Sequence, residues 1–283
     1  MSWVISKYQA AQMLDAVAAG KGSAESSADL GVSPVTVSLK PPYAVIDGVP
    51  RLSFEQLEII AADDTCYLVE EEAVSKISFF LKETGRVYKL FATGLKTPPT
   101  AEISGIRMHR TKGIDPWADT LEKLKSLGRI RGRVLDCCMG LGYTAIASLK
   151  AGAEEVYTVE EDEGMRMLAK INPWSFGLQD DRIKKIAGDV SEVVKGFSDS
   201  SFDAIIHDPP RMALAGHLYS LEFYSQLYRV MKAGGRLYHY VGSPGGRYRS
   251  KDIPSGVAKR LKAAGFTGVR EESGALGVSA GKS

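Results

Sequence analysis

The sequence has few cysteines, little net charge and no long apolar stretch, and each absence narrows what the protein can be. Its 283 residues include three cysteines, and the formal net charge is +2. Cys137 and Cys138 are adjacent and Cys66 stands alone, so neither a disulfide framework nor the paired spacing of a zinc site is present. So small a charge gives no global basic field. We therefore expect no metal and a reducing compartment.

The chain also lacks the signatures of export and of membrane insertion. No apolar run approaches the ~18 residues that a spanning helix needs. The segment 1–17 is interrupted by Lys7, Gln9 and Asp15, which predicts an amphipathic helix rather than a signal peptide. With 44% hydrophobic and 25% charged residues, the composition is that of an ordinary globular protein. These features predict a cytoplasmic protein without membrane association.

Residues 1–100 are expected to form the smaller of two domains, β-rich with an α+β character. The segment 18–31 is rich in Gly, Ser and Ala and is predicted to be a loop. Residues 35–39 alternate as in a strand, and a short helix is predicted at 54–61. A helix-turn-helix with Gly31 at its turn is an alternative, but Pro41 and Pro42 would leave its second helix barely two turns. The strand is favoured.

Residues 101–130 are predicted to connect the domains and to carry a helix at 116–127. From residue 131 to 283, strand and helix signals alternate, which predicts an α/β domain with a doubly wound, mostly parallel sheet of seven strands, Rossmann-like, with helices on both faces. In such sheets ligands bind at the carboxyl ends of the strands. Those ends are therefore the places to look for functional side chains.

The first strand of this domain ends at Asp136 and leads into a glycine turn with Gly140 and Gly142, followed by a helix that begins at Tyr143. Glycines allow a sharp turn and close approach to a ligand, and the helix offers backbone N–H groups. The turn alone would suit a dinucleotide equally well. However, the carboxylate of Asp136 would repel a diphosphate and attract a cation such as a sulfonium. We predict that these four residues bind a cofactor.

Two further acids follow the next two strands. Glu160 stands at the tip of the second strand, where a carboxylate can accept hydrogen bonds from both ribose hydroxyls. Asp189 follows the third strand, where it can accept a bond from an adenine amino group or cap the helix that begins nearby. Both are predicted to contact an adenosine, and for Asp189 the capping role stays open beside it.

The fourth strand ends in Asp208-Pro209-Pro210-Arg211, and here a resemblance emerges. The strings VLDCCMGLG, VYTVEED, GDV, IIHDPPR and VMKAGGRLYHY, in this order, resemble class I methyltransferases that use S-adenosylmethionine. With EISGIRMHR and HLYSLEFYSQLYRVMKAGG, the chain resembles a family of predicted archaeal methyltransferases, and LYSLEFY is also similar to spermidine synthases. The resemblance implies an enzyme whose cofactor is S-adenosylmethionine.

In methyltransferases that act on exocyclic amines, the resemblance implies that such a loop holds the target nitrogen. Asp208 and the carbonyl of Pro209 would accept the amine's hydrogens and keep its lone pair directed at the methyl group, with Pro210 keeping the loop rigid. Arg211 departs from the aromatic residue of that pattern. The loop also resembles that of enzymes forming 5-methyluridine, but no cysteine follows Cys138 to act as their nucleophile. Direct transfer is therefore predicted.

The acceptor is left open by the sequence. Basic clusters would suit contacts with RNA phosphates, although such residues are usually only solvated; they are Arg107/Arg110/Lys112, Arg129/Arg131/Arg133 and Arg247/Arg249/Lys251. An RNA base is the first hypothesis and a small amine the second. Arg211, His109 and Tyr219 are possible substrate contacts without an assigned role. No feature of the sequence indicates the oligomeric state.

Three other hypotheses compete with methyl transfer. Aminopropyl transfer to a polyamine would use the decarboxylated cofactor, and it calls for more carboxylates around the acceptor than Asp208 alone. A non-catalytic cofactor-binding module would leave the Asp208 loop without a purpose. An NAD-linked oxidoreductase conflicts with Asp136 in front of the glycine turn.

Overall fold

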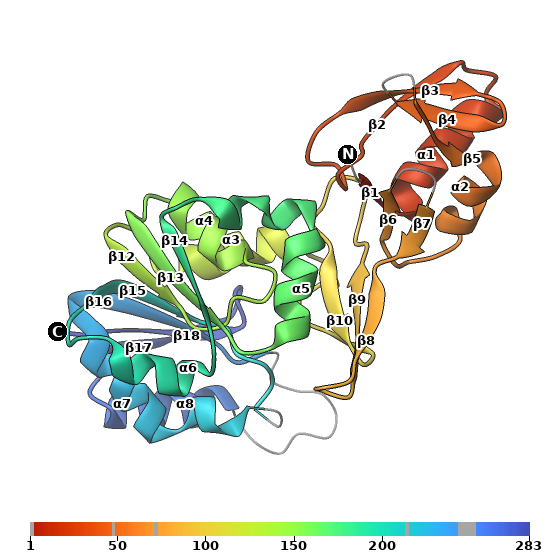
Figure 1. Ribbon diagram of the computed structural model, residues 1–283. Helices are drawn as coiled ribbons and strands as arrows, with labels where there is room; N and C mark the ends of the chain where they lie inside the picture. The colour runs from red at the N-terminus through yellow and green to blue at the C-terminus, as the bar shows by residue number, and fades with distance from the viewer. Residues whose placement is uncertain (1–2, 47–48, 71–72, 213–214, 243–252) are drawn as a thin grey trace. The chain divides into compact units, whose positions relative to one another are not determined.

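The computed structural model describes residues 3–46, 49–70, 73–212, 215–242 and 253–283. The chain divides into two compact units (Figure 1). The first unit comprises Met1–Trp117 and Gly164–Phe176, and the second comprises Ala118–Glu163 and Gly177–Ser283. These ranges differ from the expected boundaries at residues 100 and 130. Residues 101–117 go with the first unit because β10 (Thr100–Ile103), in a segment predicted to be a connection, pairs antiparallel with β9 (Arg86–Phe91).

Antiparallel strands in three small sheets build the first unit, in the orders β1-β6-β7, β2-β3-β4-β5 and β11-β10-β9-β8. Two helices, α1 (Lys7–Ala18) and α2 (Phe54–Ala61), pack with the first two sheets around a core that includes Met13 and Leu57. The remaining strands are β1 (Trp3–Ile5), β2 (Ser23–Ser26), β3 (Val35–Lys40), β4 (Tyr43–Ile46), β5 (Val49–Ser53), β6 (Tyr67–Glu70), β7 (Ala73–Lys76), β8 (Ser78–Leu81) and β11 (Ile106–Arg107).

Two sequence predictions for this unit need correction. The opening segment is not helical throughout, because the apolar run Trp3–Ile5 is buried as a strand paired with β6. Helix α1 begins only after Ser6, whose side chain and that of Gln9 form a capping box. The predicted loop at 18–31 contains β2, which pairs with β3. The strand predicted at residues 35–39 is confirmed as β3, and the helix-turn-helix alternative is wrong.

The second unit is built on a sheet of seven strands in the order β14-β13-β12-β15-β16-β18-β17. The first five run parallel, β18 is antiparallel to β16, and β17 is antiparallel to β18. Their bounds are β12 (Arg133–Asp136), β13 (Glu155–Glu160), β14 (Ile183–Ala187), β15 (Phe202–His207), β16 (Met231–Tyr240), β17 (Thr267–Glu272) and β18 (Gly277–Gly281).

Helices cover both faces of this sheet, with α3 and α4 on one side and α6, α7 and α8 on the other (Figure 1). The α/β class with a mostly parallel sheet is therefore confirmed. The helices are α3 (Pro116–Lys125), α4 (Tyr143–Lys150), α5 (Glu163–Ile171), α6 (Val190–Val193), α7 (Leu221–Val230) and α8 (Ile253–Ala263), with short 3-10 helices at Pro173–Gln179, Val194–Gly196 and Gly216–Tyr219. None of the helices in the described residues is both long and apolar enough to span a membrane.

Candidate functional site at the carboxyl edge of the parallel sheet

The strand order reverses between β12 and β15, and this switch point defines the candidate site. From β12 the chain continues outward to β13 and β14, whereas β15 and β16 lie on its other side. In open α/β sheets the crevice for a ligand forms where the order reverses, beyond the carboxyl ends of the strands. Asp136 ends β12, Glu160 ends β13 and Asp208 follows β15. Three of the predicted acids therefore belong to neighbouring strand ends.

The glycine turn after β12 is fixed by its own backbone and by Glu160. Gly140 and Gly142 have φ angles of 55° and 83°, which L side chains rarely adopt. A Cβ on Gly142 would also lie 2.5 Å from a methyl carbon of Leu178, so glycine is required there. One carboxylate oxygen of Glu160 accepts the Gly140 N–H at 2.8 Å, and the other accepts the Asp162 N–H at 2.9 Å. Both oxygens of Glu160 therefore help to fix the turn, and its contact with a ribose stays a prediction.

Asp136 lies beneath this turn and is fully buried. Its two oxygens accept the hydroxyl hydrogens of Thr144 at 2.8 Å and Thr158 at 2.6 Å. The pKa of Asp136 is raised to about 7, chiefly by burial and further by the nearby charges of Asp208 and Glu160. The two hydrogen bonds act in the opposite direction but do not outweigh the burial. The sequence predicted a ligand contact here. In the structure both oxygens accept hydrogen bonds from hydroxyls of the chain, and the ligand contact of Asp136 stays a prediction.

A lysine that the sequence patterns did not reveal occupies the acceptor end of the site. The ammonium of Lys123, on α3, lies 2.6 Å from Oδ2 of Asp208 and 2.9 Å from Oδ2 of Asp119. It also lies 4.8 Å from the centre of the Tyr240 ring. Burial alone would lower the pKa of Lys123, but the two carboxylates outweigh it and hold that pKa above its ordinary value. The lysine is therefore a buried cation shared by two acids.

In the Asp208-Pro209-Pro210 loop, one carboxylate oxygen of Asp208 is bonded to Lys123 and the other has no hydrogen bond among the described residues. The side chain of Asp208 is 21% exposed, and its Oδ2 accepts from Lys123. Within the described part of the chain, its Oδ1 makes no hydrogen bond. Pro209 is buried and Pro210 exposed, and the hydroxyl of Tyr219 donates to the carbonyl of Pro210 at 3.0 Å. Tyr219 thus holds the loop from within the core, where it is 4% exposed.

Two other predicted cofactor residues have structural roles. Asp189 is the N-cap of α6, accepting the backbone N–H and the hydroxyl of Ser191, and its other neighbour is His217 at 3.5 Å. Burial by itself would raise the pKa of Asp189, but Ser191 and His217 together outweigh it and hold that pKa below its ordinary value. Tyr143 is buried at the start of α4. The adenine contact of Asp189 and the cofactor contact of Tyr143 stay predictions.

Two of the histidines have contacts of their own, His207 in the second unit and His109 in the first. His207 points to the α7 side of the sheet, where its Nε2 bonds the carbonyl of Leu218 at 2.9 Å and its ring lies 4.4 Å from that of His239. Burial lowers the pKa of His207 to about 4, so the ring is neutral and structural. His109 belongs to the first unit, where its Nδ1 lies 3.0 Å from the hydroxyl of Thr100.

The charges at this edge decide which ligand it suits. Burial raises the pKa of the Cys138 thiol most, and the charges of Cys137, Glu160, Asp136 and Asp208 raise it further. Lys123 lies at the acceptor end, beside Asp208. A ligand with a sulfonium and an ammonium would relieve the repulsion among the acids, whereas a diphosphate would increase it. No group of acids, histidines and cysteines arranged to hold a metal occurs among the described residues.

Comparisons with known proteins agree with this geometry at the level of the fold. No family model matches the chain. Over 233 residues it is 49% identical to the uncharacterised protein MJ1233 of Methanocaldococcus jannaschii, covering 82% of this chain and 78% of that protein. Over 164 residues it is 30% identical to polyamine aminopropyltransferase 2 of Streptomyces coelicolor, covering 55% of this chain but 29% of that protein.

Among solved structures, a spermidine synthase in complex with the transition-state analogue AdoDATO aligns with a TM-score of 0.57 at 18% identity, over 75% of this chain and 76% of the other. The spermidine synthase of Thermotoga maritima gives a TM-score of 0.53 over 70% and 68%. A phosphoethanolamine N-methyltransferase of Haemonchus contortus aligns over 54% of this chain at a TM-score of 0.41, too low to carry weight. The chain has the Rossmann-like fold that methyltransferases share with spermidine synthases.

Proposed function

The chain belongs to the same family as the archaeal protein MJ1233, and on that premise we propose that it is an S-adenosylmethionine-dependent methyltransferase whose acceptor is held by Asp208. The observation that carries this proposal is the charge distribution at the sheet edge. Asp136 and Glu160 add negative charge around the glycine turn, while the acceptor carboxylate of Asp208 is paired with the ammonium of Lys123, which it shares with Asp119. That arrangement suits a cationic donor and an uncharged acceptor.

The cofactor side follows from the glycine turn and its acids. S-adenosylmethionine would supply an electrophilic methyl group on a positively charged sulfur. Glu160 would bind the ribose while it holds the Gly140 N–H. Asp136 lends negative charge beneath the turn, and Asp189 follows the strand at whose end an adenine would lie. The proposed cofactor contacts therefore start from hydrogen bonds and charges that these three acids already have in the structure.

The acceptor side works through alignment. The free Oδ1 of Asp208 would accept a hydrogen from an acceptor amine, and its Oδ2 is held in place by Lys123. The amine lone pair then attacks along the line of the donor bond; the N–C bond forms as the C–S bond breaks. Asp208 disperses the positive charge that develops on nitrogen, and the released proton leaves to solvent. We propose an amine of an RNA base, or else a small neutral amine, as the acceptor.

Aminopropyl transfer is the second candidate, because one relative is a polyamine aminopropyltransferase and two structures with this fold are spermidine synthases. The Lys123 ammonium is the observation against it. A polyamine carries several positive charges, and one of its ammonium groups would have to sit beside a buried lysine that shares Asp208 and Asp119. In a partly buried site, the repulsion between two such ammonium groups would weaken polyamine binding by an amount on the order of several kcal/mol.

The Asp208→Asn variant tests the acceptor role. The full chain is incubated with methyl-labelled S-adenosylmethionine and with RNA, protein and small-amine fractions, and label transfer is counted. Because an amide cannot offset developing positive charge, transfer should fall about a hundredfold or more, while the affinity for S-adenosylmethionine stays within about threefold. Asp199→Asn is the control, since that side chain is 75% exposed. Undiminished transfer by Asp208→Asn would refute the role.

A further inference from the structure

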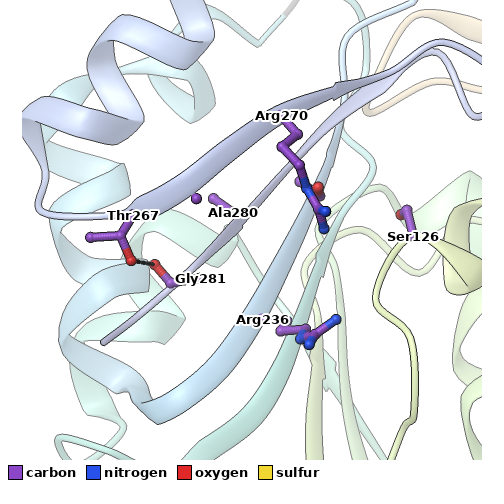
Figure 2. Close-up of a pocket in the computed structure, with 8 residues that line it drawn as sticks. Ser126, Arg236, Thr267, Arg270, Ala280 and Gly281 are labelled. Atoms are coloured by element: carbon purple, nitrogen blue, oxygen red, sulfur yellow. Dashed lines mark hydrogen bonds between the residues drawn. The ribbon is translucent and has the colours of Figure 1, made fainter.

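A second cavity lies in the same unit, and it has chemistry unlike that of the acidic sheet edge. It has a volume of about 250 Å³ and is lined by residues of β16, β17 and β18 and by Ser126, which follows α3. Its lining includes two arginines, Arg236 and Arg270, and three hydroxyl residues, Ser126, Thr267 and Ser279. Figure 2 shows both arginine side chains leaving the sheet on the same side, toward the segment that carries Ser126.

Strand register explains why the two arginines converge. Arg236 on β16 is paired with Gly281, and Arg270 on β17 is paired with Ser279, two positions earlier on the strand between them. Residues directly paired across antiparallel strands point to the same face, and so do residues two apart on one strand. The two arginines therefore flank β18 on one face. Gly281 contributes no side chain between them, which leaves the floor of the cavity open.

The two arginines of the cavity form no ion pair with an acid of the described residues. Among the described residues no carboxylate lies within ion-pair distance of either guanidinium, and the only hydrogen bond of Arg236 is a long one of 3.5 Å to the carbonyl of Leu127. Two acids follow Arg270 directly in the chain, Glu271 and Glu272, and Glu272 accepts the hydroxyl hydrogen of Ser279, which lines the cavity, at 2.6 Å. Both guanidinium groups are exposed and keep their donors available. Like charges directed into one cavity indicate an anionic ligand.

We propose that the cavity between Arg236 and Arg270 binds a phosphate group. A guanidinium presents parallel N–H donors that match two oxygens of a phosphate, and two guanidinium groups match its charge. The hydroxyl of Ser126 donates to the carbonyl of Lys123 at 2.6 Å and that of Thr267 lies 2.8 Å from the hydroxyl of Ser283, so either would have to turn from its present partner to donate to the phosphate. A cavity of this size is smaller than the pockets that enclose drug-sized ligands, so it suits the anionic group rather than a whole cofactor.

The phosphate can come from a small molecule or from a nucleic-acid backbone, and the same two arginines would bind it. Arg129 and Arg131 follow Ser126 closely in the chain, so a backbone phosphate would meet further cations along that segment. The proposal does not depend on methyl transfer, because the cavity uses none of the residues at the carboxyl edge of the sheet.

The test measures phosphate binding by the full chain calorimetrically, at constant ionic strength, with inorganic phosphate and then with a 5′-labelled oligoribonucleotide. Arg236→Gln and Arg270→Gln should each weaken phosphate binding about tenfold to a hundredfold, the range for losing a charge-assisted hydrogen bond. Arg182→Gln is the control, since that arginine is also exposed and pairs with Asp180 instead.

A third variant fills the cavity without changing its charge. A Cβ on Gly281 would have its nearest contacts at 3.5 Å and 3.9 Å, which is ordinary van der Waals distance, so Gly281→Val should fold and weaken phosphate binding by occupying the floor. Equal phosphate affinity in these three variants and the control would overturn the proposal, as would no binding by the parent chain. If RNA binding falls together with phosphate binding, the source is nucleic acid; if only phosphate binding falls, it is a small phosphate compound.

Discussion

Removing the buried ammonium with Lys123→Met is the perturbation with the largest effect that the structure predicts. The side chain of Lys123 is 5% exposed, and its partners Asp119 and Asp208 are 1% and 21% exposed. Methionine fills similar volume but leaves both carboxylates without their shared cation. Of the two carboxylates, Asp119 is the more deeply buried, so water can compensate least for its lost ion pair.

The magnitude follows from this burial. Breaking a buried ion pair by removing one partner costs about 3–5 kcal/mol. For a body of this size, each kcal/mol corresponds to about 2–4 °C of melting temperature, so Lys123→Met should melt about 6–20 °C lower. Adding Asp119→Leu should recover part of the loss, because an apolar pair replaces a lone buried charge.

Thermal melting followed by circular dichroism measures both variants beside a control in the same helix. Lys125→Met removes an ammonium that is 78% exposed and should change the melting temperature by no more than about 2 °C. If Lys123→Met melts within the same narrow range as Lys125→Met, the shared buried cation does not exist in solution. The electrostatic case against a polyamine acceptor would then fail with it.

Three smaller predictions follow. Tyr219→Phe removes the hydroxyl that holds the Pro210 carbonyl and should slow transfer severalfold without changing cofactor affinity in a binding titration, whereas Tyr228→Phe should do neither. The pKa of buried His207 is about 4 against an ordinary 6.5, so between these pH values the unfolded chain takes up a proton there that the native chain does not. Urea melts should therefore show about 3 kcal/mol of stability lost from pH 6.5 to 4, and His207→Asn should remove this contribution to the pH dependence. Asp136, with a pKa of about 7, gains charge as the pH rises, so cofactor affinity should increase from pH 6 to 8, and a flat profile or one unchanged in Asp136→Asn would contradict this.

Local sequence patterns predicted the elements of the second unit because each has its own periodicity and boundary signals. Helix α4 begins at Tyr143, and Asp136 and Glu160 end β12 and β13, all as predicted. The short strands of the first unit were missed where pairing, rather than composition, determines the structure. Ser23–Ser26 is polar and small, and it is a strand only because β3 lies beside it.

The acceptor side of the site could be predicted only in part. Asp208 was found from its place after a strand, but Lys123 is 85 positions away on another element. Asp119 and Lys123 have the i, i+4 spacing of an ordinary solvated pair. One signal was present: Lys123 stands three positions after Thr120 and four before Leu127, both buried, and so lies on the apolar face of α3. The small residues of β18 and the phosphate cavity have no comparable local signal.

The choice of donor tests the central claim most directly. The chain is incubated in parallel with S-adenosylmethionine labelled at its methyl group and with decarboxylated S-adenosylmethionine labelled in its aminopropyl group, each with putrescine and with RNA and small-molecule fractions, and the products are identified by mass spectrometry. We predict methylated product from the first donor and no labelled spermidine from the second. Labelled spermidine without any methylated product would contradict the proposed methyl transfer.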